Sequence, residues 1–255
     1  MKQILPTLLS ITLLQGCVVH VHADEELNMQ KQQLQLDARQ LNALNAETGA
    51  GALIIIGESG RTQIEVDATV YSRPDTKVTL NLAAQDKTAN FVAKTEEHFS
   101  IGESPRIDLV VKMPAALALT LSDGSGEIEV RGVQGQMQIN DGSGDIQVSQ
   151  AGALQLTDGS GEIKLANLQG NVQVSDGSGE INGSNLNGAV QIEDGSGDIH
   201  LSGIGGMVTV EDGSGDINVN GAAGLTVTSP GSGDVSYQNI RGAVSIAGED
   251  DNGKI

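Results

Sequence analysis

The sequence predicts an all-β protein, a single-stranded parallel β-solenoid with about 18 residues and two short strands per coil. Three observations support this prediction. Asp-Gly-Ser-Gly occurs six times and Pro-Gly-Ser-Gly once, at successive spacings of 17 or 18 residues. An acidic residue and then an aliphatic residue follow every copy. Apolar residues alternate with polar ones between copies. A fixed period near 20 residues indicates one unit stacked on itself, and the pattern leaves its handedness open.

One repeat explains the two strands. Ile128 and Val130 flank a single polar residue, and so do Met137 and Ile139 nine residues later. Alternation of this kind is typical of a strand with one face in the core. Each repeat therefore supplies two strands and two turns, with aliphatic ladders inside. An outward column of amides is expected to form hydrogen bonds along the stack; it consists of Gln138, Gln155, Gln173 and Gln191.

Two other 18-residue coils do not fit. Left-handed acyltransferase helices place an apolar residue every six positions, whereas the apolar gaps here are 2, 3, 4, 2 and 7. Calcium-binding β-rolls repeat G-G-x-G-x-D every nine residues. This chain has one acidic corner per 18 residues, so its likeness to a β-roll is partial.

The regular repeats, residues 123–255, follow degenerate coils and an insertion over 40–122, and together these form one solenoid domain. In the degenerate part, Thr48–Gly51 occupies a corner, and the apolar pairs Leu53/Ile55 and Ile64/Val66 are expected to follow it as strands. Pro74 and Pro105 bracket an insertion or hairpin. Further strands are predicted near Lys77–Leu82, Ile107–Val111 and Leu117–Leu121.

The N-terminus predicts a lipoprotein. Residues 1–16 form a signal peptide with Lys2 before the apolar stretch Ile4–Leu14, which is too short to span a bilayer. The sequence Leu14-Gln15-Gly16-Cys17 resembles the bacterial lipoprotein processing signal. That resemblance implies cleavage before Cys17, lipid attachment to it and a membrane anchor. Residues 17–39 are expected to form the tether, which shades into a first strand at its end. By the same resemblance, Val18 after the cysteine favours the outer membrane of a Gram-negative cell envelope.

Composition excludes several functions. Without Lys2 the mature chain has a net charge of −20, which argues against nucleic acid and against anionic headgroups. The single cysteine leaves no disulfide. With no Trp, two Phe and two Tyr, the chain has few platforms on which sugars stack.

The four histidines give no sign of an enzyme or a cofactor. His20 and His22 fall in the tether, where two ligands make a weak metal site, and His98 falls in the insertion. His200 occupies an outward slot whose equivalents in other coils are Gln, Lys and Asn, which is typical of solvated surface.

The acidic corner is the candidate site. The first acidic column consists of Asp123, Asp141, Asp158, Asp176, Asp194 and Asp212. The second acidic column consists of Glu127, Asp145, Glu162, Glu180, Asp198, Asp216 and Asp234. Like charges at strand spacing raise one another's pKa, and Ca²⁺ would relieve their repulsion. The favoured interpretation is that the first column caps its own turns and the second points into water, with calcium as the alternative.

The whole pattern resembles a bacterial family described as putative adhesins. The resemblance rests on the lipoprotein signal, the degenerate first coil, the stretch Ile107–Pro114 and the repeated Gly-Ser-Gly-[Asp/Glu]-Ile, and it covers roughly residues 40–255. It implies a β-solenoid and brings no catalytic residues.

The function expected from the sequence is non-enzymatic: adhesion, scaffolding or envelope structure by a lipid-anchored rod. The expected partner is another envelope or surface protein, or a glycan. Two alternatives stay open, a calcium-responsive surface protein that uses the acidic corners and a polysaccharide-active β-helix enzyme.

Overall fold

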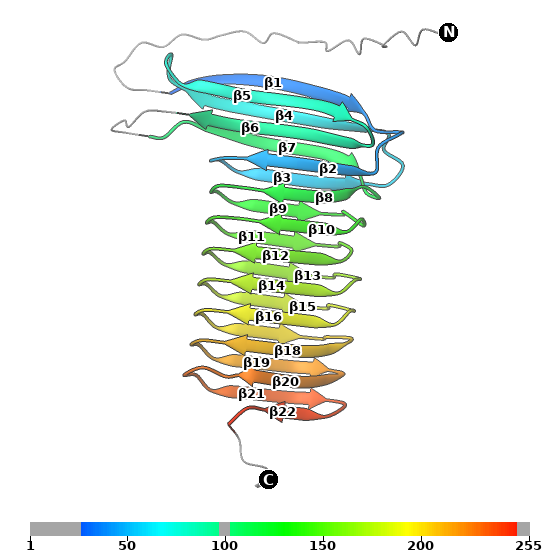
Figure 1. Cartoon of the computed structure of the whole chain (residues 1–255), viewed down its shortest axis with the longest axis vertical. Coiled ribbons are helices and arrows are strands. Elements are labelled where there is room, and N and C mark those ends of the chain that lie inside the picture. The colour runs from blue at the N-terminus through cyan, green and yellow to red at the C-terminus, as the bar shows by residue number, and fades with distance from the viewer. Residues whose placement is uncertain (1–26, 97–102, 249–255) are drawn as a thin grey trace.

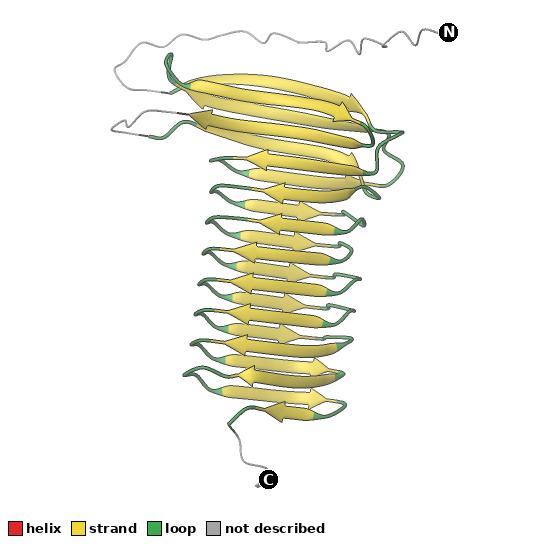
Figure 2. Ribbon diagram, in the orientation of Figure 1, coloured by secondary structure: helices red, strands yellow, loops and turns green. Residues whose placement is uncertain are grey.

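A wide head above a narrower rod forms the molecule (Figure 1). The computed structural model describes residues 27–96 and 103–248, and their regular structure consists of strands alone (Figure 2). These strands form two sheets of eleven, which we call sheet A and sheet B. None of the described segments is a helix that could cross a bilayer.

Regular two-stranded coils build the rod, as the sequence predicts. Its sheet A strands are β9 (Ile128–Arg131), β11 (Ile146–Ser149), β13 (Ile163–Ala166), β15 (Ile181–Ser184), β17 (Ile199–Ser202), β19 (Ile217–Ala222) and β21 (Val235–Ile240). Its sheet B strands are β10 (Met137–Asn140), β12 (Leu154–Asp158), β14 (Val172–Asp176), β16 (Val190–Asp194), β18 (Met207–Asp212), β20 (Gly224–Ser229) and β22 (Val244–Ile246). In the head, β8 (Ala118–Ser122) pairs with β10 and continues sheet B. Neighbours within each sheet are parallel.

In-register stacking makes the core a set of aliphatic ladders. Ile163 pairs with Ile146 on one side and Ile181 on the other, and all three are at most 1% exposed. Val172 and Val174 of β14 form the facing ladder in sheet B. The core therefore lies between the two sheets and runs the length of the rod.

The second glycine of each repeated corner is required by the stacking. Gly179 has a φ of +147°, which L side chains rarely adopt. Its N–H donates to the carbonyl of Ser196 in the next coil, at 2.9 Å. A Cβ at Gly179 would overlap the carbonyl oxygen of Gly161 in the preceding coil. The Gly-Ser-Gly repeat is thus explained by close backbone contact between corners.

The head, residues 27–122, has a less regular order. β2 (Ala43–Thr48) and β3 (Leu53–Glu58) form its first coil. β6 (Thr88–Glu96) and β7 (Arg106–Pro114), which come later in the chain, stack in parallel on β2 and β3 from above, while β8 and β9 stack on them from below. The first coil therefore lies between two segments that follow it in the sequence.

Antiparallel strands close the top of the head. In sheet A, β4 (Gln63–Ser72) lies between β7 and β1 (Asn28–Asp37) and is antiparallel to both. In sheet B, β5 (Lys77–Gln85) and β6 form a hairpin, which confirms the predicted hairpin and its strand near Lys77. The aliphatic core consequently ends beneath paired strands at this end of the rod.

Two details of the head differ from expectation. Leu53 and Ile55 join the ladder of Ile128 and Val130 as predicted. Ile64 and Val66, expected to continue the coil, instead lie in β4 antiparallel to β7. The strand expected at the end of the tether is β1, and it begins at Asn28, so the folded head starts well before residue 40. Residues 17–26 of the tether lie outside the described residues.

Candidate functional site

The first acidic column points into the rod. In β14, Val172 and Val174 face the core, so strand alternation turns Asp176 to the same side. Asp158, Asp176, Asp194 and Asp212 are paired in register through successive sheet B strands. The six aspartates of this column are only 1–8% exposed. The repeated corner thus buries one carboxyl group per coil.

Few hydrogen bonds satisfy these carboxyl groups. The backbone N–H of Gly142 donates to Asp141 Oδ1 at 2.8 Å, and that of Ser214 donates to Asp212 Oδ1 at 3.1 Å, in agreement with the predicted turn capping. At the head end, the Thr48 hydroxyl donates to Asp123. Both oxygens of Asp158, Asp176 and Asp194 are buried without such a partner. Turn capping therefore explains only part of the column.

Burial raises the pKa of every carboxyl group in the first column. The pKa of Asp141 is raised to about 6, first by burial and then by the charges of Asp123 and Asp158. The pKa of Asp194 is raised to about 6 by burial and by its neighbours Asp176 and Asp212. The direction agrees with the predicted like-charge repulsion, but loss of solvation is the larger cause.

The second acidic column has a structural role as well as an exposed position. Its aspartates accept backbone N–H groups from the next coil: Asp145 Oδ1 accepts from Glu162 at 3.0 Å, and Asp198 Oδ1 accepts from Asp216 at 2.9 Å. The longer Glu162 and Glu180 instead accept from outward side chains, Lys164 Nζ at 2.6 Å and Asn182 Nδ2 at 3.0 Å respectively. An Asp in this column bonds a backbone N–H group of the next coil. A Glu instead bonds side chains on the outer surface of sheet A.

No metal centre is assembled from the part of the chain that the structure describes. Within it, no group of three or more His, Cys, Asp or Glu side chains is placed to hold an ion. Calcium binding at the thirteen acidic candidates therefore stays a prediction. Cys17, the predicted site of lipid attachment, and the histidines His20, His22 and His98 lie outside the described residues.

His200 is part of the outer surface of sheet A. Its Nε2 lies 3.7 Å from Glu180 Oε1, and its side chain is 44% exposed. It is paired in register with Asn182 and Asn218. This agrees with its predicted place in a solvated column.

The outer surface of sheet B carries an uncharged ladder beside a groove, which we call the amide groove. Gln138, Gln155, Gln173 and Gln191 are in register and exposed, as predicted. Between these four side chains, all of which the structure describes, the predicted hydrogen bonds are not formed, and Gln191 Nε2 instead donates to Glu193 Oε1 at 3.2 Å. A shallow groove of about 520 Å³ runs beside them; its lining also includes Gln136, Ala153, Asn171, Ala189, Met207 and Thr209. Small side chains alternate with amides at its floor, so the groove offers hydrogen-bonding groups at each coil.

Amides also stack at the opposite turn. Asn185 Nδ2 donates to Asn167 Oδ1 at 3.3 Å, and Asn187 Nδ2 donates to Gln169 Oε1 at 2.7 Å. These bonds join neighbouring coils along the axis, which is the arrangement predicted for the glutamine column. Sequence analysis missed this second ladder because its residues follow the strands rather than lying in them.

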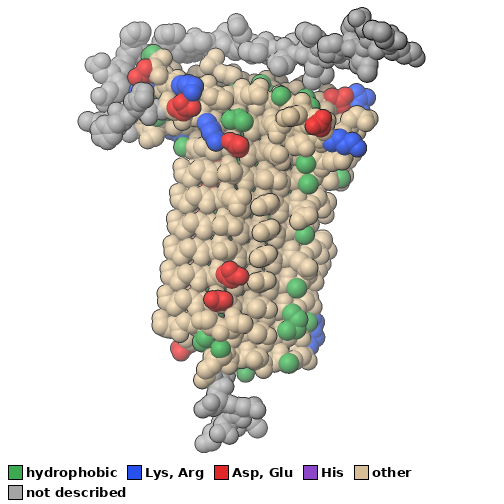
Figure 3. Space-filling model, in the orientation of Figure 1, with side chains coloured by type: hydrophobic (Ala, Val, Ile, Leu, Met, Phe, Trp, Pro, Cys, Tyr) green, Lys and Arg blue, Asp and Glu red, His purple; other side chains and the backbone are tan. Residues whose placement is uncertain are grey.

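Charge is divided unequally between head and rod. Residues 123–248 contain three basic and sixteen acidic residues, a net charge of −13. Residues 27–122 contain nine basic and eleven acidic residues, a net charge of −2. On the face shown in Figure 3, charged side chains of both signs gather on the head, and the rod below shows few.

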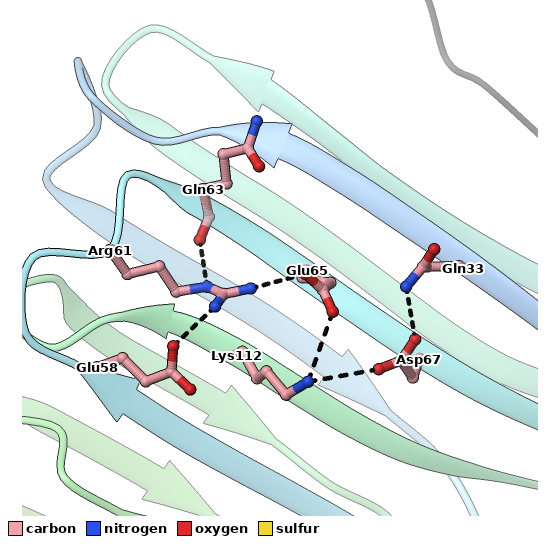
Figure 4. A network of polar contacts seen from close by, with 7 residues as sticks. All are labelled: Gln33, Glu58, Arg61, Gln63, Glu65, Asp67 and Lys112. Atoms are coloured by element: carbon pink, nitrogen blue, oxygen red, sulfur yellow. Dashed lines mark hydrogen bonds and ion pairs between the residues drawn. The ribbon is translucent and has the colours of Figure 1, made fainter.

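The head pairs its charges in a network on sheet A (Figure 4). Arg61 bridges Glu58 at 2.7 Å and Glu65 at 2.8 Å, and it donates to the carbonyl of Gln63. Lys112 of β7 lies 3.5 Å from Glu65 and 3.9 Å from Asp67, which also accepts from Gln33 of β1 at 2.9 Å. The network joins β1, β4 and β7, so it stabilises the antiparallel part of the head.

Stacked parallel coils of two strands, closed at one end by antiparallel strands, define a β-solenoid. The Toastrack DUF4097 family model matches residues 41–252, and the chain belongs to that family. No match is found among curated proteins.

Several solved structures are similar to this chain in fold. A putative adhesin from Bacteroides fragilis is 16% identical with a TM-score of 0.48; the match covers 85% of this chain and 97% of that one. A putative adhesin from Parabacteroides merdae is 16% identical with a TM-score of 0.44, covering 89% and 99% respectively. A protein from Parabacteroides distasonis described as a putative lipid binding protein is 16% identical with a TM-score of 0.46, covering 85% and 96%.

Proposed function

We propose that this protein is a lipid-anchored rod of the bacterial cell envelope that binds an extended, uncharged glycan along the amide groove, without catalysing a reaction. One observation carries the proposal: the in-register glutamines at the groove form a strip of uncharged polar side chains on a rod whose net charge is −13. The carboxylate of Glu193 borders this strip and accepts from Gln191 at 3.2 Å. Along the amides themselves, a neutral partner can approach without a charge to desolvate.

The chemistry of the strip suits hydroxyl groups. Each primary amide both donates and accepts hydrogen bonds, as a sugar hydroxyl does. Coils stack about 4.8 Å apart, so the same pair of groups is offered again at each step along the axis. A linear polymer lying along the groove would contact several coils, and weak contacts would add up through multivalency.

A non-enzymatic role agrees with the side chains that the structure describes. The side chain of His200 is exposed, and its Nε2 lies 3.7 Å from Glu180 Oε1. The amide groove is lined by amides, by Ala153 and Ala189, by Met207 and Thr209, and by the strand residues Leu154, Val172 and Val190. No observation favours the polysaccharide-active enzyme.

The lipid anchor is proposed from Leu14-Gln15-Gly16-Cys17. β1 begins at Asn28, eleven residues after Cys17, which supports a short connection between the lipid and the head. The outer membrane of a Gram-negative cell is the proposed location. The nearly neutral head would then lie near the bilayer, and the acidic rod would extend away from anionic headgroups.

A binding experiment tests the groove. The full chain is incubated with immobilised neutral and acidic envelope glycans, and binding is compared with that of the double variant Gln155→Glu/Gln173→Glu. The expected result is retention on a neutral glycan and at least a tenfold loss in the variant, because two charges would have to be desolvated. The matched control, Gln147→Glu/Asn218→Asp on sheet A, should retain binding. Equal binding by both variants, or retention only on a protein partner, would contradict the proposal.

A further inference from the structure

The first acidic column poses a problem of charge inside the rod. Its six carboxyl groups follow one another at strand spacing, about 4.8 Å, on the core side of sheet B. Nine of their oxygens are buried and accept no hydrogen bond from other groups. Six carboxylates in this position would repel one another with little water to screen them.

No described cation neutralises the column. The basic residues of the rod bind elsewhere: Arg131 pairs with Glu129, Lys164 pairs with Glu162, and Arg241 donates to the carbonyl of Gly205. His200 faces Glu180. The other charges near the column come from the second acidic column, where Asp145 acts on Asp158 and Asp198 acts on Asp212.

At both ends of the first acidic column, the neighbouring residue is neutral and carries a hydroxyl group. At the head end, the neutral Thr48 occupies the position that continues the column and donates its hydroxyl proton to Asp123. At the other end, the hydroxyl of Ser229 bonds the backbone carbonyl of Asp212, at 3.3 Å. Asp123 Oδ2 and Asp141 Oδ2 are buried without a hydrogen-bond partner, so a bond between these two carboxyl groups would satisfy both oxygens. Two carboxyl groups can form such a bond only when one of them is protonated.

We propose that the first acidic column is a proton-binding ladder, in which neighbouring carboxyl groups share protons through hydrogen bonds between coils, so that the rod is most stable in mildly acidic surroundings. Each shared proton removes one negative charge and supplies a donor to an oxygen that otherwise has none. The ladder would thus join coils at their corners, as the backbone bonds do along the strands.

The sign of the pH dependence follows from linkage. The pKa of Asp141 and of Asp194 is raised to about 6, from an ordinary value of 3.8, and the pKa of the other four is raised as well. Above about pH 4 the unfolded chain releases protons that the folded rod retains. The free energy of unfolding therefore falls as the pH rises from about 4 to beyond 6, where the column ionises, and it changes little at higher pH. An aspartate with a lowered pKa would do the opposite.

The test compares two amide variants. Asp176→Asn replaces a carboxyl group of the ladder by its uncharged isostere, and Glu180→Gln makes the same change in the second column, at a residue that bonds Asn182 on the sheet surface. Denaturant unfolding of the full chain in detergent is followed from pH 4.5 to 8.5 at constant ionic strength. Carboxylic-acid C=O absorption in the infrared gives a direct readout of protonation at pH 6.

In the wild type we expect the midpoint to fall with pH and the acid absorption to persist at pH 6. Asp176→Asn should raise the midpoint at pH 7.5 and flatten the pH profile, while Glu180→Gln should leave the profile unchanged. A midpoint that rises with pH, or no acid absorption at pH 6, would overturn the proposal. So would a stabilisation at pH 8 by millimolar Ca²⁺, beyond that of NaCl, which Asp176→Asn/Asp194→Asn removes, because the column would then hold a cation.

Discussion

Individual positions in a coil differ sharply in the substitutions that they tolerate, because each belongs to a ladder that faces either the core or solvent. An inward aliphatic residue contacts its equivalents in the coils on both sides. An outward glutamine of sheet B contacts mainly solvent. The same division explains the aspartates, since the residue at the inward end of each sheet B strand is buried whatever its polarity.

A charge placed in the core should be far more costly than one on the surface. Ile163 is 0% exposed, and Ile163→Asp would leave an unpaired carboxylate among aliphatic side chains. We expect a loss of roughly 3–5 kcal/mol in the free energy of unfolding. Gln173→Glu, on the exposed face, should change it by less than about 0.5 kcal/mol. Denaturant unfolding measures both, and similar losses in the two variants would show that the inside and outside are wrongly assigned.

A single methyl group at a corner should also be destabilising. Gly179→Ala would place Cβ against the carbonyl oxygen of Gly161 at a φ of +147°, so we expect a loss of roughly 2–4 kcal/mol. Gly49→Ala is the control, because the nearest atom to its Cβ would be 3.7 Å away. Thermal unfolding should separate the two variants clearly; a normal melting temperature for Gly179→Ala would mean that the corners are not in close contact.

At the scale of elements, the repeat determines the rod but not the head. The period, the alternation and the glycines made the two strands per coil predictable. β4 could not be placed in the same way, because Ile64 and Val66 have the same alternation whether their strand continues a coil or pairs antiparallel with β7. The alternation of apolar and polar residues is the same whichever strand is the partner and whichever direction that strand runs.

The buried carboxyl column was predictable in part. Residues 172–176, Val-Gln-Val-Ser-Asp, continue the strand alternation to the aspartate and so place it inside. The turn signal of Asp-Gly-Ser-Gly suggested a solvated cap instead, because aspartate usually begins a turn at the surface. The backbone contacts of the second column depend on the distance between coils at the corner, which the sequence does not contain.

Removal of one whole coil should preserve the fold. Deletion of residues 158–175 joins Thr157 to Asp176 and keeps every later strand in its own sheet. We expect a folded, shorter rod with somewhat lower stability, because each coil contacts only its neighbours. Deletion of residues 158–166, half a repeat, would exchange the two sheets and should abolish cooperative unfolding. Circular dichroism during urea titration checks both, and equivalent behaviour would contradict the assigned coil.

At the scale of the whole molecule, three properties coincide along one axis. The proposed lipid attachment is at the head end, charge is balanced on the head, and the rod beyond it is strongly acidic. An anionic membrane would therefore repel the rod more than the head, and the axis would stand away from the bilayer. This arrangement would present the amide groove to the surroundings rather than to lipid.

Loss of the anchor should release the molecule without unfolding it. Cys17→Ser removes the proposed attachment site, so we expect no incorporation of a clickable palmitate and recovery of the protein in the wash from membranes. The described fold starts after this residue, so the released protein should have an unchanged melting temperature. Labelling that persists in the variant would show that Cys17 is not the lipidated residue.

The position of β2 and β3 also has a consequence for the order of folding. This pair lies between β6 and β7 on one side and β8 and β9 on the other, so neither of its sheet edges has a partner until residues 88–131 have been made. Closing such long loops is slow, whereas successive coils of the rod need only a loop of one repeat. The rod can therefore assemble from neighbouring coils first. The end of the molecule that is synthesised first is the end that is completed last.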